Sequence, residues 1–206
     1  MATTRPQVRD TNRAKYETRN RLAQGAIRRF YDRLGRFVAD ARPASVLDAG
    51  CGEGEDIARL RPLLPERVEG FDIDPKSIEQ AARRFPDLKF AVEDITRSAR
   101  PGAGHDLVMA LEVLEHLPDP HAGLRELCRL TSREIIISVP DEPWFRVCNF
   151  VGGAFVSTWG NPPDHCQHWN RVTFRRFLEQ ETEVLELASP FPWLIARCVP
   201  RNGHRA

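Results

Sequence analysis

Apolar side chains recur with two different spacings, and the change of spacing divides the chain near residue 42. Over residues 9–41 they recur at helical intervals among many basic side chains, which predicts one or two basic helices. The apolar stripe consists of Leu22, Ala26, Phe30, Leu34 and Phe37 with Val38. From Pro43 onward, short and nearly continuous apolar runs alternate with helical stretches. The second part of the chain is therefore expected to form a sheet with helices packed on it.

The alternating part of the chain predicts a parallel sheet covered by helices on both faces, because its strands are apolar on both sides. The predicted strands are residues 45–49, 67–72, 88–92, 106–111, 134–139, 183–188 and 193–199. The predicted helices are residues 54–61, 75–84, 120–130 and 171–180. Pro75 and Pro120 stand at the start of their helices, where proline is tolerated in the first turn.

Residues 141–170 interrupt this alternation and are rich in Pro, Gly, Trp and His. The aromatic side chains of this insertion are Trp144, Phe145, Phe150, Phe155 and Trp159. Such a segment, with glycine hinges, suits a cover that excludes water from a pocket. Two alternatives are a membrane-facing patch that collects an amphipathic molecule and plain core packing.

Composition indicates a single soluble, globular domain of 206 residues, with 41% apolar residues and a net charge of +1. The basic cluster from Arg5 to Arg36 predicts either a solvated helix face or an arm that binds polyanions. Five scattered cysteines without a CxxC pair favour reduced thiols in a cytoplasm. No apolar run approaches the roughly 20 residues of a membrane span, and the N-terminus lacks the apolar core of a signal peptide.

A glycine-rich turn follows the strand at 45–49, in the stretch VLDAGCGEGE at residues 46–55. Ligands of open parallel sheets bind beyond the carboxyl ends of the strands, which is where this turn lies. Its glycines let a ligand approach the backbone, but its order is GxGxG and not the GxGxxG of dinucleotide sites. The carboxylates before, within and after the turn would repel a pyrophosphate and attract a cation. They are Asp48, Glu53, Glu55 and Asp56. S-adenosylmethionine carries an ammonium and a sulfonium but no phosphate, and it fits this charge pattern.

Two further strands end in acids that suit the nucleoside of such a ligand. Asp72 in GFDID is placed to accept from both ribose hydroxyls, with Ile73 against the adenine. Asp94 in VEDI is placed to accept from the adenine amino group, with Ile95 as an apolar wall. A loop-capping role is the alternative for either aspartate.

VLDAGCGEGE, GFDIDPKSIEQA, VEDI and DLVMALEVLEHL together resemble the successive motifs of class I S-adenosylmethionine-dependent methyltransferases, over residues 43–140. The resemblance implies a Rossmann-like α/β fold with a seven-stranded mixed sheet, ordered 3-2-1-4-5-7-6 with strand 7 antiparallel. Residues 1–42 would be a basic helical lid, and residues 43–206 the methyltransferase domain with its aromatic-rich insertion. The product would be S-adenosylhomocysteine. The cofactor residues carried over by position are Asp48, Gly50, Cys51, Gly52, Gly54, Asp72, Asp94 and Leu111, with Cys51 expected to pack and not to react. In the lid, Tyr16 and Arg19 are candidates for contacting the cofactor's carboxylate.

The methyl acceptor is expected near ALEVLEHLPDPH, residues 110–121, and near His165 and His168. On a helical turn, Glu112 would share a face with Glu115 and His116. The proposed catalytic residues are Glu112, His116 and His165, with His116 as the general base for a hydroxyl acceptor. Direct in-line transfer to oxygen or nitrogen is the expected chemistry.

Two resemblances compete for the acceptor. EVLEHLPDP is similar to small-molecule O-methyltransferases of the ubiquinone-biosynthesis kind, which implies a natural-product, quinone-like or lipid-linked acceptor. ExxEH with a later DHxxxW resembles the Hen-type methyltransferases of small-RNA 3′-terminal ribose. That second resemblance implies a divalent metal on Glu112, Glu115, His116 and His165, with Trp169 and Phe174 as flanking aromatics. The small-molecule reading is favoured, with no metal required. A non-catalytic adenosyl-binding scaffold is a further alternative, but such a protein would be expected to have lost the glycines or the ribose-binding acid.

Overall fold

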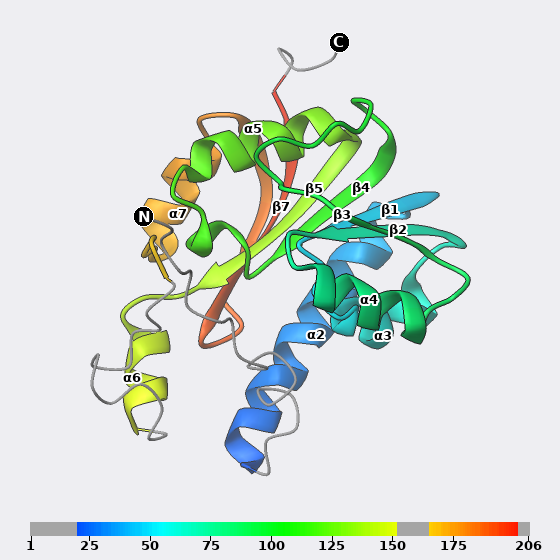
Figure 1. The fold of residues 1–206 in the computed structure, drawn as a ribbon. Coiled ribbons are helices and arrows are strands. Elements are labelled where there is room, and N and C mark those ends of the chain that lie inside the picture. The colour runs from blue at the N-terminus through cyan, green and yellow to red at the C-terminus, as the bar shows by residue number, and fades with distance from the viewer. Residues whose placement is uncertain (1–19, 152–164, 202–206) are drawn as a thin grey trace, which may run out of the picture.

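A mixed β-sheet forms the centre of the structure, a computed structural model that describes residues 20–151 and 165–201 (Figure 1). The strand order is β3-β2-β1-β4-β5-β7-β6, in which β7 runs antiparallel to both β5 and β6 while the other pairs are parallel. The strands are β1 (Ser45–Ala49), β2 (Arg67–Asp72), β3 (Lys89–Val92), β4 (His105–Leu111), β5 (Thr131–Pro140), β6 (Thr182–Ala188) and β7 (Trp193–Pro200). The predicted fold class and strand order are confirmed.

Helices cover both faces of the sheet. The α-helices are α2 (Arg21–Ala41), α3 (Glu55–Leu60), α4 (Pro75–Arg84), α5 (Pro120–Leu130), α6 (Trp144–Val151) and α7 (Arg171–Leu178). Two short 3-10 helices are η1 (Arg61–Leu63) and η2 (Leu114–His116). In Figure 1, α2, α3 and α4 lie on one side of the sheet, and α5 and α7 lie on the other.

Alternation along the strands produces two hydrophobic clusters, one on each face. In β4, Leu107 and Met109 belong to the cluster of α2 and α3, whereas Val108 and Ala110 belong to the cluster of α5 and α7. Successive side chains of a strand point to opposite faces. A strand covered on both sides must therefore be apolar at every position, which is the pattern that the sequence has.

The starts of the helices follow the sequence signals closely. Asp74 accepts from the N–H groups of Lys76 and Ser77 before α4, and Asp119 accepts from Ala122 before α5. In both helices proline fills the first position, where its missing N–H costs nothing. The helices predicted at 75–84 and 120–130 have these bounds in the structure.

The basic N-terminal helix packs as part of the domain core. In α2, Phe30, Leu34 and Phe37 are buried in the same cluster as Val46 and Leu107 of the sheet. Leu22, which the predicted stripe included, is 85% exposed. The proposed boundary at residue 42 therefore separates two sequence patterns that share one hydrophobic cluster, and the lid function of residues 1–42 stays a prediction.

The insertion at 141–170 contains α6, a helix that the sequence did not predict. Its two ends meet, because Asp141 and Trp169 form a bridge and the Glu142 N–H donates to the carbonyl of Trp169 at 2.8 Å. The insertion therefore leaves and rejoins the domain at the carboxyl edge of β5 (Figure 1). Phe155 and Trp159 lie outside the described residues.

Among the described residues, no helix is both long and apolar enough to cross a bilayer. No disulfide joins the five cysteines, all of which lie in the described part of the chain.

Candidate functional site

The glycine turn after β1 is a tight loop whose N–H groups are already used inside the protein. Gly50 and Cys51 both donate to the carbonyl of Phe71, at 2.8 and 3.0 Å. Gly52 donates to Asp72 Oδ2 at 2.9 Å, and Gly54 donates to the carbonyl of Cys51 at 2.9 Å. Phosphate sites at such loops depend on backbone N–H groups that point at the ligand. These four N–H groups point elsewhere, so the turn is poorly suited to a phosphate.

Left-handed backbone explains the glycines of the turn. Gly50, Gly52 and Gly54 have φ values of 85°, 51° and 75°, a region that costs other residues about 1–2 kcal/mol. A Cβ on Gly50 would also lie 2.5 Å from Cγ2 of Val113. The GxGxG spacing is thus required by conformation, and at Gly50 by the close approach of the segment after β4.

Three carboxylates surround this turn. Asp48 is 1% exposed, and its Oδ2 has no hydrogen-bond partner among the described residues. Burial raises the pKa of the Asp48 carboxyl well above its usual value, and the nearby charges of Asp56 and Asp72 raise it further. Burial of the Asp48 carboxyl is therefore not offset by a hydrogen bond to its Oδ2 from the described residues. A cation in the turn would relieve the mutual repulsion of these acids.

Asp72 stands at the end of β2 with both carboxylate oxygens engaged. Its Oδ2 accepts from Gly52, and its Oδ1 accepts from the N–H of Asp74 at 2.9 Å. A carboxylate has about four acceptor positions, so two ribose hydroxyls can still be accepted. The neighbouring Ile73 is 53% exposed, so its side chain is accessible to an adenine base.

The residues predicted to contact the adenine of the cofactor already make contacts within the protein. Asp94 Oδ1 accepts from the N–H and the hydroxyl of Thr96, at 2.9 and 2.7 Å, which is the loop-capping role that the sequence left open. Ile95 and Leu111 are each 6% exposed and belong to the core clusters. Cys51 is 4% exposed, and burial raises the pKa of its thiol, in keeping with a packing role.

Tyr31 of α2 joins the acidic turn, although no motif indicated it. Its hydroxyl donates to Asp56 Oδ1 at 2.6 Å, and the guanidinium of Arg59 lies 5.0 Å from its ring centre. Tyr31 falls at helical spacing between the buried residues Ile27 and Leu34, so only its place on the stripe could have singled it out. Tyr16 and Arg19 lie outside the described residues.

On the acceptor side, three of the four proposed metal ligands come together. Glu115, His116 and His165 offer ligand atoms that all lie within 4.8 Å of one another. The two imidazole rings are 4.9 Å apart at 79°. The N–H groups of Cys166 and Gln167 donate to the carbonyl of Glu115, at 2.7 and 3.1 Å. These bonds fasten the returning end of the insertion to η2 and place His165 beside His116.

Glu112 lies outside this group, and the helical turn expected to align it with Glu115 does not form. Glu112 has a φ of 57° and precedes η2, so helical spacing does not apply to it. Its Oε1 accepts from the hydroxyl of Ser138 at 3.1 Å, and its Oε2 accepts from the indole N–H of Trp193 at 2.8 Å. Glu112 thereby joins β4 to β5 and β7.

His168 also lies apart from the cluster. Its Nδ1 is 3.8 Å from Oε1 of Glu142, a carboxylate whose side chain is 10% exposed. Burial raises the pKa of Glu142, and burial with the nearby charge of Arg146 lowers the pKa of His168. These opposite shifts favour the neutral form of both groups.

An aromatic wall connects the acceptor side to α2. Phe145 of α6 stacks on His165 with ring centres 5.8 Å apart and also contacts Trp193 at 6.2 Å. Trp193 packs edge-on against Phe30 of α2 at 5.3 Å. The insertion thus contributes an apolar side to the space next to His116. Trp169 and Phe174, the other predicted aromatics, are buried and in contact with each other at 5.9 Å.

Known proteins similar to this chain are methyltransferases or have the methyltransferase fold. Trans-aconitate 2-methyltransferase of Methylobacterium radiotolerans is 33% identical over 137 residues, which cover 63% of this chain and 52% of that protein. 27-O-demethylrifamycin SV methyltransferase of Amycolatopsis mediterranei is 32% identical, over 51% of this chain and 41% of that protein. The chain therefore spans only about half the length of these curated relatives.

Among solved structures, magnesium protoporphyrin IX methyltransferase from Synechocystis with bound SAH superposes with a TM-score of 0.68, at 21% identity over 92% of both chains. This likeness shows a common fold. A family model described as a methyltransferase domain matches residues 19–181, which is most of the chain. The chain belongs to this family of methyltransferase domains.

Proposed function

We propose that this protein binds S-adenosylmethionine at the turn after β1 and transfers its methyl group to a small-molecule acceptor next to η2. The proposal rests on the charge and the hydrogen bonding of this turn. Three carboxylates meet there, while the backbone N–H groups of Gly50, Cys51, Gly52 and Gly54 are satisfied internally. A nucleoside that carries positive charge fits such a site, and a nucleotide phosphate does not.

Each part of the cofactor has a matching group on the chain. The ammonium of the methionine end suits the acids Asp48 and Asp56, the ribose suits Asp72, and the adenine suits the exposed Ile73 with Asp94. Tyr31 holds the Asp56 carboxylate in place from α2. The sulfonium would then lie near the start of η2, since Val113 lies so near Gly50 that a Cβ there would be 2.5 Å from its Cγ2.

Transfer would be a direct displacement at the methyl carbon. A lone pair of the acceptor forms the new bond while the carbon–sulfur bond breaks, its electrons return to sulfur, and S-adenosylhomocysteine leaves. If the acceptor is a hydroxyl, His116 takes its proton. Most of the acceleration would come from holding the two reactants in line, with the aromatic wall of Phe145 and Trp193 excluding water.

The acceptor is proposed to be a small molecule. The curated relatives named above are methyltransferases of trans-aconitate and of 27-O-demethylrifamycin SV, both of which are small molecules and not macromolecules. The space beside His116 is bounded by residues of the insertion, so the insertion is expected to set acceptor choice.

Calorimetry with S-adenosylhomocysteine tests the cofactor site. Asp72→Ala is expected to weaken binding by about 100-fold or more, because two hydrogen bonds of a charged acceptor to the ribose are lost. Asp87→Ala removes an exposed carboxylate whose ion pair with Arg61 is 3.3 Å long and serves as the matched control. Undiminished binding by Asp72→Ala would refute the ribose assignment.

A second candidate, metal-assisted transfer, is favoured by the convergence of Glu115, His116 and His165. One carboxylate and two imidazoles suit Mn²⁺, Zn²⁺ or Fe²⁺ better than Mg²⁺, which prefers oxygen ligands. In that case His116 would be a ligand and not the base, and the ion would orient the acceptor's hydroxyls. Glu112, held by Ser138 and Trp193, would take no part.

An EDTA assay separates the two candidates. Transfer to a small acceptor that survives EDTA supports the metal-free reaction, whereas EDTA-sensitive transfer to an RNA 3′ end, restored by Mn²⁺, supports the metal-assisted one. His165→Ala sharpens the comparison, because it should abolish Mn²⁺ binding in a metal protein. A chain that binds the cofactor yet transfers to neither class would be the non-catalytic scaffold.

A further inference from the structure

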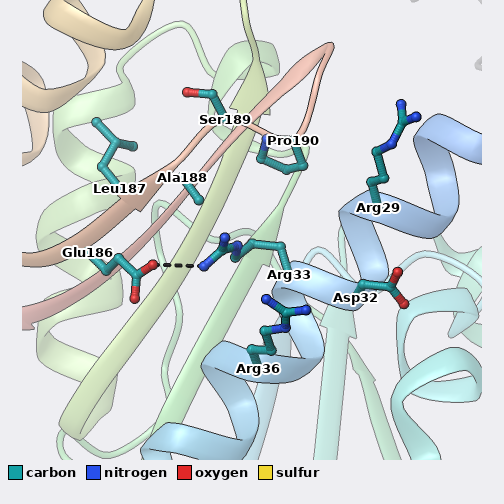
Figure 2. Close-up of a pocket in the computed structure, with 9 residues that line it drawn as sticks. All are labelled: Arg29, Asp32, Arg33, Arg36, Glu186, Leu187, Ala188, Ser189 and Pro190. Carbon is teal, nitrogen blue, oxygen red and sulfur yellow. Dashed lines mark hydrogen bonds and ion pairs between the residues drawn. The ribbon is translucent and has the colours of Figure 1, made fainter.

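A basic groove lies between α2 and the β6–β7 turn (residues 189–192), away from the cofactor site. Its volume is about 390 Å³, and it is lined by Arg29, Asp32, Arg33, Arg36 and residues 186–190. Figure 2 shows Arg33 reaching across to Glu186, while Asp32 points to the opposite side of the helix. The Arg33–Glu186 pair is 2.9 Å long. Arg29 and Arg36 are exposed.

The balance of charge in the groove is positive. A further guanidinium, that of Arg171, donates to the Ser189 hydroxyl and to the carbonyl of Leu187, both at 2.7 Å, and so holds the β6–β7 turn. Its charge adds to those of the three arginines of α2, and the acids among the described residues that line the groove are Asp32 and Glu186. Arginines at this spacing along one helix can contact several anionic groups of one surface.

Next to the groove, apolar side chains are exposed on α6 and on the same β6–β7 turn. Trp144 is 53% exposed, Val147 is 47% exposed and Phe191 is 48% exposed. The rings of Trp144 and Phe191 are 6.4 Å apart, so they form one patch. In Figure 1, α6, the β6–β7 turn and the first half of α2 project from the same edge of the molecule.

We infer that this edge docks on an anionic lipid surface, with Trp144 and Phe191 entering the interface and Arg29 and Arg36 contacting lipid phosphates. A tryptophan beside arginines suits the boundary between headgroups and acyl chains, where an apolar ring and a cation are both accommodated. The docking surface includes α6, which lies on the same insertion as His165, so a docked molecule would present the acceptor side of its sheet to the membrane. The inference goes beyond the proposed methyl transfer and does not depend on it.

Vesicle sedimentation of the full chain tests the inference. Binding is expected to vesicles of equal parts phosphatidylglycerol and phosphatidylcholine, to weaken with salt, and to be far weaker to phosphatidylcholine alone. Arg29→Ala with Arg36→Ala should weaken binding about 25-fold, since each arginine near such a surface contributes about fivefold. Trp144→Ser should weaken it about tenfold.

Matched controls come from parts of the surface away from the groove. Arg125→Ala on α5 and Val92→Ala in β3, at the opposite edge of the sheet from β6, alter exposed side chains and should leave vesicle binding unchanged. Circular dichroism and S-adenosylhomocysteine binding should be unchanged in every variant, which separates loss of docking from loss of the cofactor site. Retention of vesicle binding by the double arginine variant, or complete competition by glycerol phosphate at matched phosphate concentration, would overturn the inference.

Discussion

At the scale of single residues, the carboxyl of Asp48 lies in an environment that is costly for a charge. It is buried in β1 beside Asp56 and Asp72, and its pKa is raised by burial first and by these two charges next. A carboxyl with a raised pKa in the folded state holds its proton to a higher pH than in the unfolded chain. Its ionisation therefore destabilises the folded protein as the pH rises from the ordinary aspartate range toward the raised pKa.

A cationic ligand should reverse this penalty, because it favours the ionised form of Asp48. We expect the thermal stability of the protein without cofactor to fall over that pH range while the affinity for S-adenosylmethionine rises. Asp48→Asn removes the titrating carboxyl, so both thermal stability and affinity for S-adenosylmethionine should depend less on pH in this variant. Differential scanning fluorimetry and calorimetry across the pH range measure the two effects, and an affinity for S-adenosylmethionine that falls with rising pH would contradict the account.

Residues with a local signal were predictable, and residues that act through distant contacts were not. The carboxylates at strand ends and the glycines of the turn could be read from motifs, because their role is set by a few neighbours in the chain. Tyr31 reaches Asp56 across 25 positions, and Trp193 reaches Glu112 across 81 positions. Only the folded sheet makes such pairs neighbours, so the bonds of Glu112 to Ser138 and Trp193 could not be foreseen. Its catalytic role stays a prediction.

Replacement by alanine should therefore affect the stability of the protein differently at Glu112 and at His116. Glu112→Ala leaves the indole N–H of Trp193 and the hydroxyl of Ser138 without their acceptor, which should cost about 1–3 kcal/mol of unfolding free energy. His116→Ala, at a side chain that is 38% exposed, should change stability little and reduce methyl transfer. Urea denaturation compares the two, and equal destabilisation would contradict the roles given to them.

At the scale of elements, helices with an Asp-Pro start were predicted to the residue, whereas α6 was missed. Asp74–Pro75 and Asp119–Pro120 combine a cap with a proline at the first helical position. α6 follows Pro143 in a stretch rich in glycine and aromatics, and such composition favours irregular structure over a helix of eight residues. Strand β5 begins at Thr131, three residues before its predicted start, because Thr131 pairs with His105.

Two glycine-to-alanine changes should have opposite effects. Gly50→Ala places a Cβ 2.5 Å from Val113 Cγ2 at a φ of 85°, and should destabilise by about 3 kcal/mol. Gly25→Ala lies within α2, where a Cβ meets nothing within 4 Å, and should stabilise by about 0.5–1 kcal/mol. Denaturation midpoints check both, and a neutral Gly50→Ala would show that the turn tolerates the extra carbon.

At the scale of the whole molecule, the residues proposed for the cofactor and for the acceptor lie at the carboxyl edge of the parallel strands. The acidic turn follows β1, and Asp72, the proposed ribose acid, ends β2. His116 follows β4, and His165 beside it comes from the insertion after β5. Strand-end chemistry of this kind is expected of an open α/β sheet, and the strand order was predictable from the family resemblance. The insertion adds the aromatic wall and the proposed membrane-docking patch, neither of which the sheet itself requires.

We expect this edge to accept a nucleoside that is cationic and free of phosphate. Calorimetric titration of the purified chain with S-adenosylmethionine, S-adenosylhomocysteine, ATP and NADH is the decisive experiment. The first two should bind, and the two phosphate-bearing ligands should not. Binding of ATP or NADH, with no uptake of the methyl donor or its demethylated product, would contradict this expectation.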